Sequence, residues 1–250
     1  MERGSAQLGR RLPLLRGLPN FRDLGGIHCA DGRVRRAQVF RAPALNTLLP
    51  EDAETLAALD PETIIDLRGP DEVQTAPMPA LAARRLPMPI PPSAAHRLRQ
   101  AMLAQRLSEA TAHALMIDTY ADFVLQHSHV FAALLRRLAE AARPVVFHCT
   151  AGKDRTGLAA ALFLTACGAA RPAIEADYLR TATLWSPDPG LAALVPEPAR
   201  EALFGVRTAY LDAAFDALDR HHGSAQAFVR NALGDDAALL AFRDRYVETG

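Results

Sequence analysis

The sequence predicts an α/β fold, in which buried strands are followed directly by helices. Residues 145–147 are Val-Val-Phe, a short β-branched and aromatic run that is typical of a strand buried on both faces. Residues 158–166 follow with strong helix formers and an apolar face. Residues 63–68 begin with a second buried run and lead into a turn and a short helix. A strand followed at once by a helix is the unit from which α/β folds are built.

The first sixty residues predict a hairpin, a strand and a helix. Residues 1–12 form a loose, basic leader. Asp31-Gly32, set between apolar residues, is a strong hairpin signal. Residues 39–41 give the next short strand. Residues 50–59 predict a helix with acidic residues in its first turn, and this helix ends before Pro61.

The strand at 63–68 ends in charged residues, Asp66 and Arg68. At the carboxyl end of a strand such residues belong either to a ligand site or to a structural salt-bridged cap, and the pattern leaves both open. Residues 83–92 are too rich in proline for a central strand, so we expect an edge strand followed by a loop. Residues 112–142 carry a long helical pattern, and its apolar side chains at helical spacing, Tyr120 among them, are expected in the core.

The last third of the chain predicts mainly helices. Gly168 ends the helix that begins near residue 158, and residues 171–180 start another with proline in the first turn. The stretch around 185–205 is punctuated by prolines and apolar, and is either a lid of short helices or a packed connector. Three scaffold helices follow between residue 209 and about residue 247. We expect one domain over residues 1–250.

Composition and charge argue against several classes of partner. Apolar residues make up 50% of the chain and the formal net charge is zero, which argues against a nucleic-acid partner or a basic membrane-binding surface. The three cysteines, Cys29, Cys149 and Cys167, form no disulfide framework and favour a reducing compartment. No signal peptide and no integral membrane segment is evident. We expect a cytoplasmic protein, with export by a route without a cleaved signal left open.

The segment between the strand at 145–147 and the helix after it carries the chemistry. It places Cys149, five further residues and Arg155 in a tight turn, at the edge of the sheet where ligands bind in open α/β folds. Its backbone amides can form a cup at the positive end of a helix, which suits a phosphate group. Gly152 supplies backbone freedom at the bend, and the planar fork of Arg155 can hold two phosphate oxygens.

Cys149 lies at the floor of this predicted cup. Helix-terminus amides and a nearby guanidinium favour its thiolate, which is an in-line nucleophile for a clamped phosphorus and would form a phosphocysteine intermediate. Thr156 can then donate its hydroxyl to the sulfur and ease its departure. We expect His148 to orient the loop from behind rather than to act as a base.

The stretch His148-Cys149, five residues, Arg155-Thr156-Gly157 resembles the signature of the cysteine-dependent protein tyrosine phosphatase superfamily. With the motif at residues 20–26, it resembles a bacterial group of atypical tyrosine phosphatases, some with dual or phosphoinositide specificity. Further matching positions are Arg41, residues 65–68 and Asp177-Tyr178. The resemblance implies a central, mostly parallel sheet of four or five strands flanked by helices. It also implies an arginine, Arg41, near the mouth of the site and a helical lid near residues 185–205.

The general acid is left open by the sequence. Classical phosphatases of the superfamily carry this aspartate on a mobile loop that would follow residues 83–92, but no Asp or Glu occurs between Glu72 and Glu109. Asp154 is the candidate that the resemblance favours, and Asp66 on the neighbouring strand is its competitor. Lys153 either recognises extra phosphate groups, as in phosphatases that act on inositol lipids, or is a solvated lysine.

We therefore predict a phosphatase that acts on phosphorylated proteins or phosphoinositides, with phosphotyrosine as the expected substrate and phosphoserine or phosphothreonine as further ones. A catalytically silent phosphate-binding module and a rhodanese-like sulfurtransferase are the alternatives. No Asp/His cluster suits metal-dependent chemistry, so we expect no metal and no cofactor. The predicted site has catalytic residues Cys149, Arg155, Asp154, Asp66 and Thr156, substrate-binding residues Thr150, Ala151, Gly152, Lys153, Arg41 and Arg68, and His148 in support.

Overall fold

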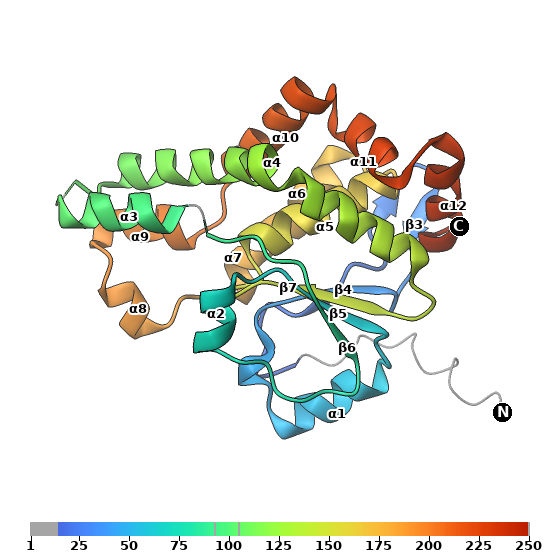
Figure 1. Ribbon diagram of the computed structural model, residues 1–250, viewed down its shortest axis with the longest axis horizontal. Helices are drawn as coiled ribbons and strands as arrows, with labels where there is room; N and C mark the ends of the chain where they lie inside the picture. The colour runs from blue at the N-terminus through green and yellow to red at the C-terminus, as the bar shows by residue number, and fades with distance from the viewer. Residues whose placement is uncertain (1–14, 93, 105, 250) are drawn as a thin grey trace.

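The computed structural model describes residues 15–92, 94–104 and 106–249 (Figure 1). The leader expected at residues 1–12 lies outside these ranges. A five-stranded sheet forms the centre, in the order β1-β4-β7-β5-β6. Its strands are β1 (Arg22–Asp23), β4 (Val39–Ala42), β5 (Thr63–Asp66), β6 (Arg84–Pro87) and β7 (Val145–His148). All neighbouring strands are parallel except β1, which pairs antiparallel with β4. The α/β class and the mostly parallel sheet are confirmed.

Both faces of the sheet are covered, which explains why its strands are continuous apolar runs. Alternate residues of the central strand β7 point to opposite faces: Val145 and Phe147 belong to a large core, and Val146 belongs to a smaller one. Figure 1 shows the helices of the large core on one side of the sheet and α1 on the other. Leu56 of α1 closes the smaller core.

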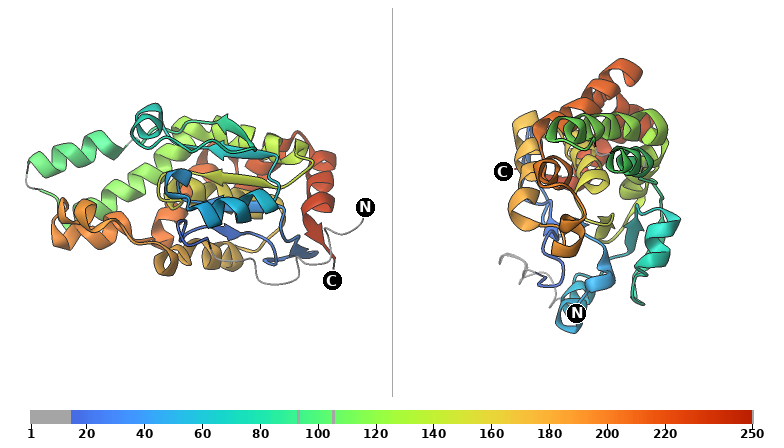
Figure 2. Two further views of the ribbon diagram at one scale, coloured as in Figure 1. Left: turned by 90° about the horizontal axis from the view of Figure 1, so that it is seen from below. Right: turned by 90° about the vertical axis from the view of Figure 1, so that its left-hand side faces the viewer.

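The helices follow the predicted pattern closely. The longest, α4, has 32 residues and begins after Ser108, whose side chain accepts a hydrogen bond from the Thr111 amide. Figure 2 shows α3, α8 and α9 extending beyond the sheet together with the first part of α4. The helices are α1 (Pro50–Ala58), α2 (Pro70–Thr75), α3 (Ala94–Leu103), α4 (Glu109–Glu140), α5 (Asp154–Ala166), α6 (Arg171–Leu179), α7 (Thr181–Leu184), α8 (Pro189–Ala193), α9 (Glu197–Phe204), α10 (Thr208–His222), α11 (Ala225–Leu233) and α12 (Asp236–Tyr246).

A second, small sheet lies beside the first. It consists of β2 (His28–Cys29), β3 (Gly32–Val34) and β8 (Val247–Glu248), all antiparallel. The predicted hairpin is therefore present, with its turn at Ala30-Asp31 and Gly32 as the first residue of β3. The end of the described chain pairs with it. Within the described ranges, no helix is long and apolar enough to cross a membrane.

Candidate active site

The loop between β7 and α5 lies at the carboxyl edge of the sheet, with β4 and β5 on either side of β7. Cys149 directly follows the central strand and is 2% exposed. Arg155 lies in the first turn of α5 and is also buried. The turn predicted between a strand and a helix thus brings both residues to the edge where parallel sheets bind ligands.

The carbonyl groups of the loop are held from behind. The Asn20 side-chain amide donates to the carbonyls of Ala151 and Gly152, at 3.0 Å each, and Arg41 donates to the Gly152 carbonyl at 2.8 Å. The C=O and N–H of a trans peptide point in opposite directions. The amides of Gly152 and Lys153 are therefore turned away from Asn20 and Arg41, which is the arrangement of an anion-binding cup.

Gly152 has the backbone freedom that was predicted for it. Its φ is +64°, and a Cβ on this residue would lie 2.5 Å from the carbonyl oxygen of Ala42. The loop therefore bends tightly over the end of β4, which no larger residue permits.

Arg41 does not lie at the mouth of the site, where the resemblance placed it. Its side chain is fully buried, and its guanidinium pairs with Asp177 at 2.7 Å. Arg22 pairs with the same carboxylate at 2.7 Å. Burial alone would raise the pKa of Asp177, but the two arginines outweigh it and hold that pKa below its ordinary value. In this structure Arg41 thus supports the loop from beneath, through the Gly152 carbonyl and Asp177.

Asp66 and Arg68 form a buried pair. Arg68 Nε and Nη2 each donate to the Asp66 carboxylate at 2.9 Å, and Arg85 donates to it as well, at 2.9 and 3.1 Å. Burial would raise the pKa of Asp66, yet hydrogen bonds and charge from Arg68, together with the charge that His148 carries once it is protonated at low pH, lower it to about 2. Of the two possibilities left open, the structure shows the salt-bridged cap, in which Asp66 and Arg68 pair with each other.

His148 is buried behind the loop. Its Nδ1 lies 3.1 Å from the Cys149 carbonyl oxygen, and its Nε2 lies 3.7 Å from Asp66. Burial lowers the pKa of His148 to about 4, although Asp66 beside it favours the charged form. The ring is therefore neutral near pH 7 and braces the backbone at Cys149.

Asp154 opens α5 and has a side chain that is 25% exposed. Its carboxylate accepts a hydrogen bond from the Tyr120 hydroxyl at 2.9 Å, and that hydroxyl lies 2.7 Å from the hydroxyl of Tyr178. Burial and the nearby Asp154 charge raise the pKa of Tyr120 well above its ordinary value, so it stays protonated and can donate. Tyr120 was expected only in the core, and helical spacing carries no signal for this contact.

Lys153 is neither a solvated lysine nor a cation on the rim. It is buried, and its ammonium donates to the carbonyls of Leu203 and Gly205 at 2.7 and 3.1 Å. These carbonyls lie at the carboxyl end of α9, where a cation is favourable. The loop is thereby tied to the segment that was considered as a lid.

Glu72 is the site residue that sequence reasoning missed. Its carboxylate pairs with both Nη atoms of Arg155, at 2.6 and 2.7 Å, and accepts a hydrogen bond from the Thr150 hydroxyl. The local signal at Glu72 was that of a helix cap, because it lies three residues after Gly69 at the start of α2.

Thr156 is buried in the first turn of α5. Within the described part of the chain its hydroxyl oxygen has no hydrogen-bond partner, so the expected bond to the Cys149 sulfur is not formed in this state. A buried hydroxyl without a partner is costly and is a common feature of functional sites.

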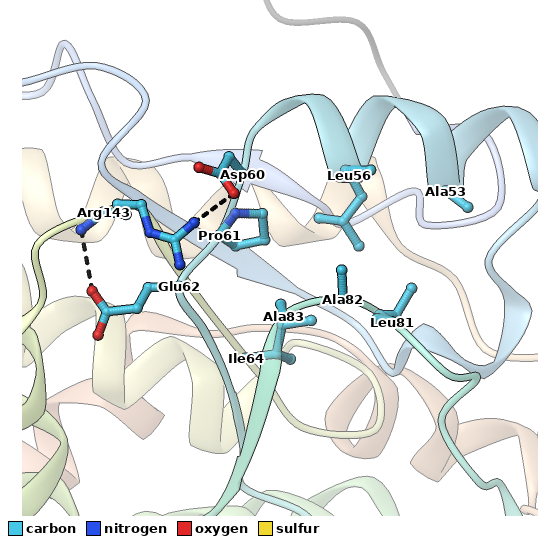
Figure 3. Close-up of a pocket in the computed structure, with 11 residues that line it drawn as sticks. Ala53, Leu56, Asp60, Pro61, Glu62, Ile64, Leu81, Ala82, Ala83 and Arg143 are labelled. Carbon is cyan, nitrogen blue, oxygen red and sulfur yellow. Dashed lines mark hydrogen bonds and ion pairs between the residues drawn. The ribbon is translucent and has the colours of Figure 1, made fainter.

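A pocket at the opposite edge of the sheet is unrelated to this loop. Figure 3 shows it at the start of β5, lined by Leu56, Ile64 and other apolar side chains. Arg143 pairs there with Asp60 at 2.6 Å. Across the described ranges, no group of three or more His, Cys, Asp or Glu side chains could hold a metal ion.

Comparison with known proteins agrees with this geometry. The sequence profile of the tyrosine phosphatase family matches residues 13–248. A Cupriavidus necator protein that carries a tyrosine-protein phosphatase name, H16_A0669, is 36% identical over 89% of this chain and 84% of its own length. The triple specificity protein phosphatase PtpB of Mycobacterium tuberculosis is 30% identical over 89% of this chain and 93% of its own.

Among solved structures, TpbA of P. aeruginosa matches 74% of this chain and 91% of its own, with 18% identity and a TM-score of 0.36. That likeness is weak, whereas the family profile spans nearly the whole chain. The chain belongs to the tyrosine phosphatase family.

Proposed function

We propose that this phosphatase hydrolyses phosphate monoesters through a phosphocysteine intermediate on Cys149. The observation that carries the proposal is the loop itself, in which anchored carbonyls turn the amides toward one cup beside Cys149 and Arg155. The thiolate attacks phosphorus, and the bond from phosphorus to the leaving-group oxygen breaks. Water then attacks the phosphocysteine, the P–S bond breaks, and the thiolate is restored as inorganic phosphate leaves.

Asp154 is our choice for the general acid, which gives a proton to the leaving oxygen in the first step. Its partial exposure and its hydrogen bond from Tyr120 support this role, because they leave the carboxyl in reach of a substrate and fixed in direction. The buried pair with Arg68 argues against Asp66. We assign the free hydroxyl of Thr156 to the sulfur as it departs in the second step.

The acid is tested by the pH–rate profiles of Asp154→Asn and Asp66→Asn on a phosphotyrosine peptide. We expect only Asp154→Asn to lose the basic limb, with little effect on an ester whose leaving group needs no proton. A profile for Asp154→Asn that matches the wild type would contradict the assignment.

For the substrate we propose phosphotyrosine, with phosphoserine, phosphothreonine or phosphoinositides as further groups, in a reducing compartment such as the cytoplasm. Membership of the tyrosine phosphatase family supports phosphotyrosine as a substrate. The name of the triple specificity relative supports a wider range of substrates. Because α9 carbonyls occupy Lys153, extra phosphate groups would meet this lysine only if α9 moves.

We further propose that residues 185–205, which include α8 and α9, act as a lid within a single phosphatase domain. The two hydrogen bonds from Lys153 to the end of α9 support it. Deleting residues 187–203 should raise activity on bulky substrates or expose Cys149 to oxidation. Unchanged turnover and unchanged oxidation would count against a lid.

The decisive test of function is phosphate release without added metal by wild type and Cys149→Ser. The substrates are a phosphotyrosine peptide, a phosphoserine peptide and short-chain phosphoinositides. Phosphate release by the wild type but not by Cys149→Ser supports the thiolate mechanism. The order of the release rates among the three kinds of substrate identifies the preferred class. No release from any of them would favour a silent phosphate-binding module.

A further inference from the structure

Every acceptor position of the Glu72 carboxylate is used. Oε1 accepts from Arg155 Nη2 at 2.7 Å and from the Thr150 hydroxyl. Oε2 accepts from Arg155 Nη1 at 2.6 Å and from the Gly69 amide at 2.8 Å. Two donors on each oxygen, from three different residues, fix this carboxylate in one orientation.

The guanidinium of Arg155 is left with one open edge. Of its five N–H groups, those on Nη1 go to Glu72 and to the Ile90 carbonyl, at 2.9 Å, and one on Nη2 goes to Glu72. Within the described ranges Nε has no acceptor, and the other contact of Nη2 is a long one to Thr150, at 3.5 Å. The Nε and Nη2 hydrogens lie on the same edge of the planar group, which is the geometry for binding two phosphate oxygens.

We propose that Glu72 is the positioning residue for Arg155, holding its Nη1/Nη2 edge so that the Nε/Nη2 edge meets the phosphate. This inference rests on the proposed phosphatase function and adds a residue from α2 to the machinery of the loop. Glu72 itself touches neither the phosphate nor the thiolate.

A competing interpretation is that Glu72 imitates the phosphate and must leave before a substrate binds. Two observations oppose it. Glu72 takes the Nη1/Nη2 edge of Arg155 and leaves the adjacent Nε/Nη2 edge open, and it also caps α2 through the Gly69 amide, so its departure would uncap that helix. Burial would raise the pKa of Glu72, but hydrogen bonds and charge from Arg155 outweigh it and lower that pKa, so the carboxylate is ionised at neutral pH.

The two interpretations predict opposite signs for the same substitution. Glu72→Gln removes a negative charge beside an anion site, so by charge alone, or by release of a competitor, phosphate should bind more tightly. If Glu72 positions the guanidinium, the same substitution should weaken binding. Asp71→Asn is the matched control, because it removes one exposed negative charge from the same turn of α2 without touching Arg155.

The experiment measures kcat, KM and inhibition by phosphate and vanadate for wild type, Glu72→Gln, Glu72→Asp and Asp71→Asn. We expect Glu72→Gln to lower kcat/KM by about 10²-fold, as small displacements of a positioning group do. We expect it to weaken inhibition by both anions, vanadate more than phosphate because vanadate imitates the transition state. Glu72→Asp should also lower kcat/KM and weaken inhibition by the two anions, but by less. Asp71→Asn should match the wild type.

A merely structural role would lower kcat through loss of folded enzyme and leave KM and both inhibition constants unchanged, which would overturn the proposal. Tighter anion inhibition or faster turnover in Glu72→Gln would overturn it in favour of a competitor. Phosphate binding to Cys149→Ser and to Cys149→Ser with Glu72→Gln, measured by calorimetry, does not depend on turnover. Weaker binding in the second protein supports positioning even if no substrate is hydrolysed. Equal or absent binding in both overturns it.

Discussion

Replacing Asp66 with asparagine would separate a structural carboxylate from a catalytic one. The Asp66 side chain is fully buried and accepts hydrogen bonds from the guanidinium groups of both Arg68 and Arg85. Asparagine keeps one acceptor oxygen but turns an N–H₂ donor toward groups that can only donate. Two arginines then lose their counter-charge, one of them fully buried.

The loss in free energy of unfolding can be estimated in two ways. The pKa of Asp66 falls from 3.8 to about 2 on folding, and such a shift is equivalent to about 2 kcal/mol of stability at neutral pH. Removing one partner of a buried ion pair costs about 3–5 kcal/mol. For a loss of about 3 kcal/mol, the Tm of a chain of this size should fall by about 6–12 °C.

The dependence on pH has a definite sign. Because the folded pKa lies below the unfolded one, the stability contributed by Asp66 is present above about pH 4 and is lost as the pH falls toward 2. The asparagine variant has no such group to titrate. The gap in unfolding free energy between wild type and variant should therefore be widest at pH 7 and smaller at pH 3.

Urea unfolding at pH 7 and pH 3 measures this gap, and the pH–rate profile of the same variant measures its catalysis. A gap below about 1 kcal/mol, of the size expected for an exposed pair, or one that stays constant with pH, would refute the ion-pair reasoning. Loss of the basic limb of the rate profile would instead show that Asp66 is the acid.

Three further substitutions test other contacts. Tyr120→Phe removes the hydrogen bond to Asp154 and should lower kcat about tenfold on phosphotyrosine, the value of one hydrogen bond, but not on an ester whose leaving group needs no proton; equal losses on both would argue against it. Lys153→Met should speed amide hydrogen exchange in α9, because two hydrogen bonds at its end are lost; unchanged exchange would contradict that link. Asp177→Asn should cost about 3 kcal/mol in thermal or urea unfolding, because two buried arginines lose their counter-charge, and a neutral effect would show that the cluster is dispensable.

The backbone of the site could be predicted from the sequence because its signals are local. Residues 145–147 predicted a buried strand and Gly152 marked the bend after it. The helix formers after Gly157 predicted α5, although this helix begins four residues earlier, at Asp154. The hairpin at Asp31-Gly32 is of the same kind. In each case a run of a few neighbouring residues decides the conformation.

The partners of the charged side chains could not be predicted, because they come from distant parts of the chain. Glu72 and Arg155 are 83 positions apart, and Arg41 and Asp177 are 136 apart. Whether Lys153 faces water or α9 depends on how that helix packs, which no local pattern encodes. Periodicity assigned Tyr120 to the core correctly, yet its hydroxyl is what matters at the site.

The hydrogen bonds from Asn20 and Arg41 to the loop carbonyls also have a consequence for substrate selectivity. These hydrogen bonds orient the amides of the loop in the folded protein, so in the mechanism we propose an arriving phosphoryl group meets donors that need no rearrangement. This preorganisation of the amides favours every phosphate ester equally, because the amides contact only the phosphoryl group, which all of these esters share. Substitution of Asn20 should therefore lower the activity on all substrates by the same factor and leave the order of preference among them unchanged. Preference for one ester over another has to originate in the groups around the rim of the cup.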